Sequence, residues 1–221
     1  MYAFAQRADT TVVDEPLYAH YLSHQPTEAE HPGREAVLAE QNPNGKEVID
    51  TLLHQDYGTE NVLYKQMTHH LVELESNFLY GMTNVLLIRD PYEILDSFGK
   101  VVTNITAEDI GLPQQGELFN TLTVTGSLSA VVDARRLLED PRRVLQELCE
   151  LLDIEYDPAM LQWEAGPKPY DGSWAEYWYA GVHRSTGFEP RPHKIIKLSP
   201  DLARVAEEVK PIYQRLLEHA I

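Results

Sequence analysis

The chain has 221 residues, 43% hydrophobic and 24% charged, a composition that excludes wholesale disorder. Its 18 Lys and Arg residues against 35 Asp and Glu residues give a net charge of −17, so binding to nucleic acid or to an anionic membrane is not expected. The single cysteine, Cys149, excludes an internal disulfide and a cysteine-type zinc site. The longest clearly apolar run, residues 85–88, is far shorter than the roughly 20 residues of a membrane span. We therefore expect a cytoplasmic protein.

Four short, mostly apolar segments are predicted to be strands. Each is a continuous run rather than an alternating one, which is typical of strands covered on both faces in a parallel sheet. Helix-like stretches lie between and after them, so the pattern predicts an α/β fold with crossover connections. The predicted strands are Thr11–Asp14, Asn61–Lys65, Asn84–Arg89 and Ser129–Asp133.

Three predicted helices follow the third and fourth strands. Asp-Pro pairs at residues 90–91 and 140–141 provide an N-cap followed by proline at the first helical position, and each precedes an apolar stripe. Cys149 lies on the stripe of the second of these helices, which predicts a core residue rather than a nucleophile. A third stripe over residues 198–216 has steps of three and four.

Arg89 and Ser97 form the first candidate site. Arg89 closes a predicted strand directly before a helix N-terminus, where unpaired backbone N–H groups and partial positive charge favour a phosphate group. Ser97 lies two turns into that helix, on the edge of its apolar stripe, where its hydroxyl can share an anion with Arg89. On spacing alone, a structural ion pair of Arg89 and an uninvolved serine are the favoured explanation.

Two further clusters carry titratable groups that suit group transfer. Lys65 ends the second strand, where it can neutralise charge on a leaving group, and His69 and His70 in the following loop can accept a proton. Glu15, just after the first strand, and His20 are also possible bases. Adjacent histidines without further ligands at metal spacing do not predict a metal site.

Four segments in order resemble the sulfotransferase family, in the branch of bacterial proteins and of plant proteins fused to an aminotransferase-like domain. The segment LLIRDPYEILDSF resembles the family's nucleotide 3′-phosphate motif, in which an Arg and a Ser are eight residues apart. The other segments are VVDEPLYAHYL, VVDARRLLEDPRRVLQELCELLDI and EAGPKPYDGSWAEYWYAGVHRSTGF. The resemblance covers most of the chain, so we expect one sulfotransferase-like domain over residues 1–221.

The resemblance implies transfer of a sulfuryl group from 3′-phosphoadenosine 5′-phosphosulfate (PAPS) to a hydroxyl or amine of a small-molecule acceptor, without a metal. It implies a P-loop NTPase-like three-layer fold with a parallel sheet. Arg89 and Ser97 correspond to the receptors of the 3′-phosphate, and Lys65 resembles the lysine near the bridging oxygen. Glu15, His69 and His70 remain alternative bases. The cations available to a polyanionic donor are Arg89, Lys65, Arg135, Arg136, Arg184 and Lys194, with Arg135 and Arg136 expected on an exposed turn.

The family's first strand and its phosphosulfate-binding loop, which is rich in Gly, Ser and Thr, have no counterpart here. The chain begins within the helix that should follow this loop, and no other glycine has the required context. Without the loop the 5′-phosphosulfate lacks its cradle of backbone N–H groups. Activity is therefore expected only if the loop is supplied. Two explanations stay open: a truncated version of an active enzyme, or a natural fragment.

Three functions remain as hypotheses. The first is a sulfotransferase, the second a non-catalytic homologue or fragment that acts through nucleotide or protein binding, and the third another P-loop-type transferase such as a small-molecule kinase. Exposed sheet edges would favour a homo-oligomer. Aromatic side chains crowd residues 163–179 and either line an acceptor pocket or pack this segment onto the sheet.

Overall fold

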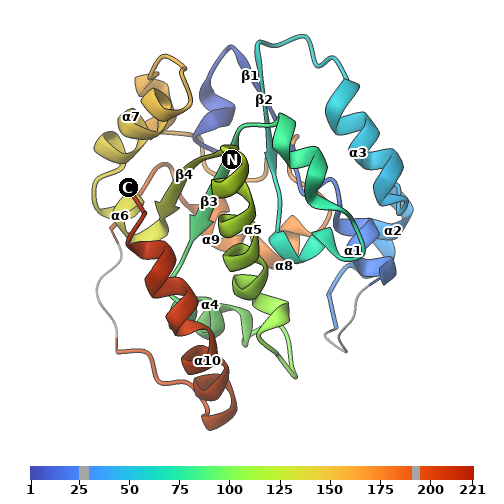
Figure 1. Ribbon diagram of the computed structural model, residues 1–221, viewed down its shortest axis with the longest axis vertical. Coiled ribbons are helices and arrows are strands. Elements are labelled where there is room, and N and C mark those ends of the chain that lie inside the picture. The colour runs from blue at the N-terminus through green and yellow to red at the C-terminus, as the bar shows by residue number, and fades with distance from the viewer. Residues whose placement is uncertain (25–29, 191–194) are drawn as a thin grey trace. The chain divides into compact units, whose positions relative to one another are not determined.

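The computed structural model describes residues 1–24, 30–190 and 195–221, and the chain forms two compact units (Figure 1). The first unit comprises residues 1–26, 31–75 and 157–188, and the second comprises residues 27–30, 76–156 and 189–221. The expectation of a single domain over residues 1–221 stays a prediction.

The first unit contains one pair of parallel strands and short helices. The helical segment predicted at the start of the chain is a 3-10 helix over Phe4–Gln6, and two further 3-10 helices cover Thr68–Leu71 and Pro158–Leu161. The remaining elements are β1 (Thr10–Asp14), α1 (Tyr18–His24), α2 (Arg34–Glu40), α3 (Gly45–His54), β2 (Asn61–Lys65), α8 (Ala175–Trp178) and α9 (Ala180–Arg184).

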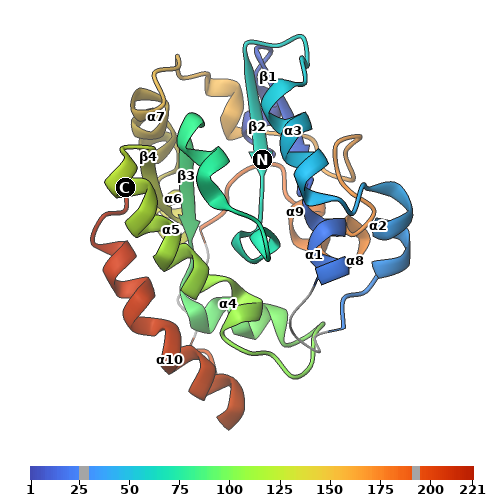
Figure 2. The same ribbon diagram turned by 45° about the vertical axis from the view of Figure 1, so that its right-hand side comes forward.

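The second unit contains the other parallel pair and the longer helices. Its strands and α-helices are β3 (Asn84–Ile88), α4 (Pro91–Phe98), α5 (Leu112–Thr125), β4 (Leu128–Asp133), α6 (Ala134–Glu139), α7 (Pro141–Leu151) and α10 (Pro200–Leu217), with 3-10 helices at Ser76–Gly81 and Glu108–Ile110. Helix α10 packs beside α5 and α4 (Figure 2).

All four predicted strands are confirmed, and both strand pairs are parallel. β1 pairs with β2 in a register that places Asp14 opposite Lys65. β3 pairs with β4, with Ile88 opposite Asp133. Because the carboxyl ends of parallel strands meet at one edge, the charged residues that end each pair are brought together within their own unit.

The predicted helix starts are also confirmed. The Asp90 carboxylate accepts the Tyr92 N–H at 2.8 Å, and the Asp140 carboxylate accepts the Arg143 N–H at 3.2 Å. In each case a proline follows, whose missing N–H costs the first helical turn nothing. Cys149 is buried on the apolar side of α7, as its position in the stripe predicts.

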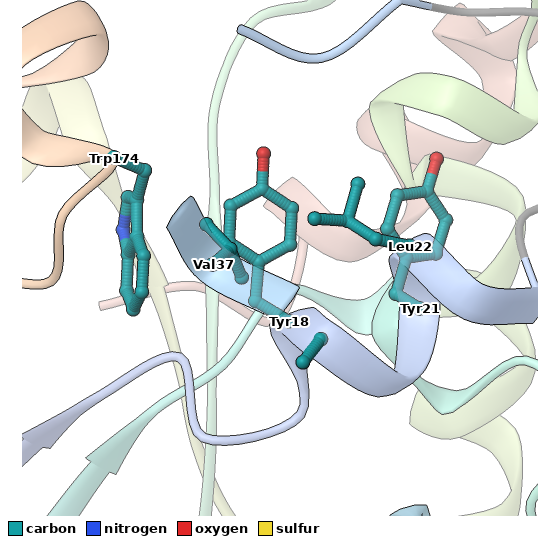
Figure 3. Close-up of a cluster of buried hydrophobic side chains, with 6 residues drawn as sticks. Tyr18, Tyr21, Leu22, Val37 and Trp174 are labelled. Atoms are coloured by element: carbon teal, nitrogen blue, oxygen red, sulfur yellow. The ribbon is translucent and has the colours of Figure 1, made fainter. Parts of the chain in front are cut away.

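A hydrophobic cluster in the first unit holds α1, α2 and the segment before α8 together. Tyr18, Tyr21 and Leu22 of α1 are buried with Val37 of α2 and with Trp174 (Figure 3). The indole of Trp174 meets the ring of Tyr18 edge to face, with 5.2 Å between centroids. The cluster therefore fixes the C-terminal aromatic segment against the helix that follows β1.

Candidate functional site

In the first unit, the carboxyl ends of β1 and β2 form a compact charged group. Lys65, the last residue of β2, makes an ion pair with the carboxylate of Glu15, which directly follows β1. The Lys65 ammonium also lies 3.5 Å from Asp14 Oδ1. Both carboxylates are buried, whereas the side chain of Lys65 is 28% exposed. The structure thus brings two of the predicted site residues, Glu15 and Lys65, into direct contact.

The backbone of Glu15 is held in an unusual conformation. Its φ is +41°, in the left-handed region that residues with a Cβ avoid. The Glu15 N–H donates to the Lys65 carbonyl at 2.8 Å, and the Glu15 carbonyl accepts from the Tyr18 N–H and from the Gln41 side chain. Strain of about 1–3 kcal/mol at such a residue persists only where its surroundings fix it, and it is concentrated at functional sites.

Tyr179, which follows α8, joins this charged group. Its hydroxyl accepts from Lys65 Nζ at 2.9 Å and donates to the carboxylate of Asp14, 2.8 Å from each oxygen. Sequence reasoning gave no role to Asp14 and placed Tyr179 only among the aromatic residues of the C-terminal segment. The position of Asp14 directly before Glu15 is the signal that could have identified it.

The other aromatic residues of that segment differ in exposure. Trp163 and Trp174 are buried, so these two pack the segment onto the rest of the first unit. Tyr177 is 42% exposed. The alternative in which packing explains the aromatic cluster is therefore confirmed for the two tryptophans.

His69 and His70 lie in the 3-10 helix after β2 and are both buried. The imidazole of His70 stacks on the rings of Tyr18 and Tyr21, with centroids 4.8 and 5.0 Å away, and its Nε2 lies 3.9 Å from Glu15 Oε2. Burial, followed by the charges of His69 and Lys65, lowers the pKa of His70 well below the usual value of histidine. His70 is therefore neutral at pH 7 and a weak base.

Acid should destabilise the protein through His70. The unfolded chain binds a proton at His70 near pH 6.5 and the folded chain does not, so lowering the pH through 6.5 favours unfolding, by up to about 1.4 kcal/mol per pH unit. Urea unfolding at pH 7.5, 6.5 and 5.5 should show this slope in the wild type. It should be reduced in His70→Gln and kept in His54→Gln, whose exposed imidazole serves as the control. An unchanged slope in His70→Gln would contradict the prediction.

His20, the other possible base, faces two backbone carbonyls. Its Nε2 lies 2.8 Å from the Val72 oxygen and its Nδ1 3.3 Å from the Pro43 oxygen. The imidazole thus connects α1 to the segments after β2 and before α3. This placement favours a structural role for His20.

In the second unit, Arg89 lies at the carboxyl end of β3 and contacts the first turn of α4. Arg89 Nε donates to Glu93 Oε2 at 3.1 Å, and the other carboxylate oxygen of Glu93 pairs with Arg135. Among the described residues, the terminal amino groups of Arg89 have no hydrogen-bond partner, so they can donate to a ligand. Arg135 follows β4, the strand that pairs with β3.

Ser97 is on the same side of α4 as the Arg89 contact. Glu93 and Ser97 are four residues apart within α4 and so share a face of the helix, and Glu93 accepts the hydrogen bond from Arg89, which precedes the helix. The side chain of Ser97 is exposed. The structure is therefore compatible with one anion reaching both Arg89 and Ser97.

The expectation that Arg135 and Arg136 lie on an exposed turn is wrong. Both are partly buried in the first turn of α6, and their N–H groups donate to the carboxylate of Asp133, which caps the helix. The Arg136 side chain donates to the Ala220 carbonyl. Arg184 is exposed at the end of α9, and Lys194 lies outside the described residues.

Two properties of the described residues bear on cofactors and membranes. Across residues 1–24, 30–190 and 195–221, no three or more His, Cys, Asp or Glu side chains are grouped so that they could hold a metal ion. In the same part of the chain, no helix has both the length and the apolar character needed to cross a bilayer.

Comparison with known families gives a match over almost the whole chain. The model of the sulfotransferase domain matches residues 1–216. The chain belongs to the sulfotransferase family. The resemblance predicted from the four sequence segments is thereby confirmed, and with it the P-loop NTPase-like α/β fold of that family.

Known relatives include plant and bacterial proteins. Branched-chain-amino-acid aminotransferase-like protein 1 of Arabidopsis thaliana is 38% identical over 224 residues, which cover 99% of this chain but only 39% of that protein. The sulfotransferase domain of the curacin biosynthetic pathway is 16% identical, with a TM-score of 0.43 over 93% of this chain and 79% of that domain. The sulfotransferase domain of the Synechococcus PCC 7002 olefin synthase is 14% identical, with a TM-score of 0.47 over 91% and 94%.

Proposed function

We propose that this chain, when the phosphosulfate-binding loop of its family is supplied, transfers a sulfuryl group from PAPS to a hydroxyl or amine of a small-molecule acceptor. The observation that carries the proposal is the contact between Lys65 and Glu15 at the carboxyl ends of β1 and β2, in a member of the sulfotransferase family. Ligands of open parallel sheets bind at this edge. A cation and a base are the two groups that the reaction requires, one for the leaving group and one for the acceptor proton, and a carboxylate can be that base.

Each unit, taken by itself, has residues that suit part of a polyanionic donor. In the second unit, the terminal amino groups of Arg89, which have no hydrogen-bond partner among the described residues, and the hydroxyl of Ser97 suit the 3′-phosphate, because a guanidinium donates two parallel hydrogen bonds to phosphate. In the first unit, the Lys65 ammonium suits the oxygen that bridges the sulfuryl group and the 5′-phosphate. We assign donor binding to these three residues.

In the proposed step, the acceptor oxygen or nitrogen attacks sulfur while the bond from sulfur to the 5′-phosphate oxygen breaks. The electron pair of that bond stays on the phosphate, where the Lys65 ammonium neutralises the charge. The acceptor proton passes to a base. Positioning and electrostatic stabilisation dominate such a loose, in-line displacement.

We propose Glu15 as the base, and His69 and His70 as the alternatives. Glu15 is supported by its strained backbone and by its contact with Lys65. The low basicity and full burial of His70 argue for a supporting role, in which the imidazole lies beside the Glu15 carboxylate. While Lys65 pairs with Glu15 the carboxylate is a weak base, and it becomes a stronger one when Lys65 turns to the donor.

We further propose a cytoplasmic location. The partners we propose are the nucleotide donor and a small-molecule acceptor.

The proposal is tested on the chain with the family's phosphosulfate-binding loop supplied, using PAPS labelled in its sulfuryl group and a panel of phenols, alcohols and primary amines. The reverse direction uses 3′,5′-adenosine bisphosphate and 4-nitrophenyl sulfate and is followed by release of nitrophenol. We expect label on at least one acceptor, with stoichiometric release of the bisphosphate. Intact donor with every acceptor, together with no nitrophenol, would overturn the proposal. Phosphorylation of an acceptor by ATP instead would support the kinase hypothesis.

A further inference from the structure

Lys65 is surrounded by more partners than the proposed chemistry uses. Its ammonium meets Glu15, the Tyr179 hydroxyl at 2.9 Å and Asp14 at 3.5 Å, and it lies 5.2 Å from the centre of the Tyr179 ring. An ammonium group has three protons to donate, so these contacts fix the orientation of the Lys65 ammonium group. Of these partners, only Glu15 has a role in the proposed reaction.

We propose that Asp14 and Tyr179 are positioning residues for Lys65, which hold its ammonium group at the carboxyl end of β2 while it acts on the leaving group. This inference rests on the proposed function. Lys65 leaves Glu15 during the reaction, so a second anchor must keep the ammonium in place. The Tyr179 hydroxyl and the Asp14 carboxylate form that anchor.

The direction of each hydrogen bond in the anchor is determined by chemistry. Burial and the charge of Asp14 raise the pKa of Tyr179, so its hydroxyl keeps its single proton. That proton faces the Asp14 carboxylate, and the oxygen lone pairs are left for the Lys65 ammonium. The Tyr179 hydroxyl therefore links Lys65 to Asp14 by two hydrogen bonds. The Asp14 carboxylate polarises this hydroxyl, which strengthens its hydrogen bond with the Lys65 ammonium.

The anchor is itself held in place. Asp14 is buried, ends β1 and accepts the Gly172 N–H at 3.3 Å. Asp171, the residue before Gly172, also has a buried side chain. Its carboxylate accepts hydrogen bonds from the Tyr2 hydroxyl at 2.8 Å, from the Lys168 N–H and from His183 Nε2 at 3.0 Å. Two neighbouring carboxylates thus fix the segment that carries Tyr179.

Asp14 also acts on the protonation of Lys65. Burial lowers the pKa of Lys65 below the usual value of lysine, and the charge of Asp14 opposes this shift. The other titratable groups near Lys65 are Glu15, Tyr179, His70 behind Glu15, and the amino group of Met1, whose pKa burial lowers to about 6. Above pH 7, His70 and this amino group are neutral, so the two carboxylates keep the ammonium charged.

The test measures the pKa of Lys65 directly. Lysines are dimethylated with ¹³C-formaldehyde, the Lys65 signal is assigned by its loss in Lys65→Arg, and its shift is followed by NMR between pH 6 and 11. In Asp14→Asn the pKa of Lys65 should fall by about 1–3 units, because an opposite charge at this distance has been removed. The pKa that defines the alkaline limb of the pH–rate profile should fall by the same number of units, since turnover needs the ammonium form of Lys65.

Tyr179→Phe removes a single oxygen and tests positioning without changing a charge. We expect kcat to fall about 10-fold while binding of 3′,5′-adenosine bisphosphate is unchanged. Tyr80→Phe, at an exposed tyrosine of the 3-10 helix Ser76–Gly81, is the matched control and should change neither kcat nor binding of the bisphosphate. An unchanged pKa of Lys65 in Asp14→Asn, or an unchanged kcat in Tyr179→Phe, would overturn the inference. The NMR titration needs no turnover, so its outcome is separate from that of the proposed function.

Discussion

Lys65→Met is expected to lower kcat by about 10²- to 10³-fold, the loss measured when one donor to a developing negative charge is removed. The variant keeps the length of the side chain but leaves the leaving phosphate oxygen without its cation. Binding of 3′,5′-adenosine bisphosphate should be retained, because Arg89 and Ser97 are unchanged. Lys65→Arg keeps the charge, should fold normally, and should retain intermediate activity. The measurement is kcat with labelled donor, alongside a calorimetric titration.

Lys100→Met is the matched control for this prediction. Lys100 is 68% exposed and pairs with Asp96 at a spacing of four residues, so its loss should cost well under 1 kcal/mol and leave turnover unchanged. Lys65→Met also leaves Asp14 and Glu15 buried with one cation fewer, so thermal unfolding must show that the variant folds. A folded Lys65→Met protein with kcat within fivefold of wild type would contradict the assigned role.

Arg89→Ala is expected to weaken binding of 3′,5′-adenosine bisphosphate by about 10- to 100-fold, since a hydrogen bond to a charged group contributes about 1.5–3 kcal/mol. Ser97→Ala should weaken it by a smaller factor of about 2- to 10-fold, because a neutral hydroxyl contributes about 0.5–1.5 kcal/mol. Calorimetry at constant salt concentration measures the dissociation constant of each variant. Raising the salt concentration should reduce wild-type affinity and the effect of Arg89→Ala together.

Arg143→Ala is the control for Arg89→Ala. Arg143 pairs with Glu147 four residues on, as Arg89 pairs with Glu93, but it lies on the exposed surface of α7. Its replacement should leave the dissociation constant unchanged. Equal dissociation constants for wild type and Arg89→Ala would show that the 3′-phosphate is not bound by Arg89.

The strands and their charged ends could be predicted from sequence because a buried parallel strand is a short continuous apolar run that stops where the chain meets water. Asn61–Lys65 has the predicted bounds, and the other three strands differ by one residue at one end. The capped starts of α4 and α7 were equally visible, because an Asp-Pro pair acts on the helix that it begins.

The partners of the site residues could not be predicted in the same way. Tyr179 and Asp14 are 165 positions apart, and their contact depends on how the C-terminal segment packs against β1. The pairing of Arg135 with Glu93 requires β3 and β4 to be neighbours in the sheet, which a single sequence does not specify. The expectation of an exposed turn failed at Arg135 for this reason.

The most direct test of the central claim is the affinity of the unaltered chain for 3′,5′-adenosine bisphosphate compared with adenosine 5′-monophosphate, measured by calorimetry at one salt concentration. The two ligands differ only in the phosphate assigned to Arg89 and Ser97. We predict at least about 10-fold tighter binding of the bisphosphate. Equal affinities, or no binding of either nucleotide, would contradict the account.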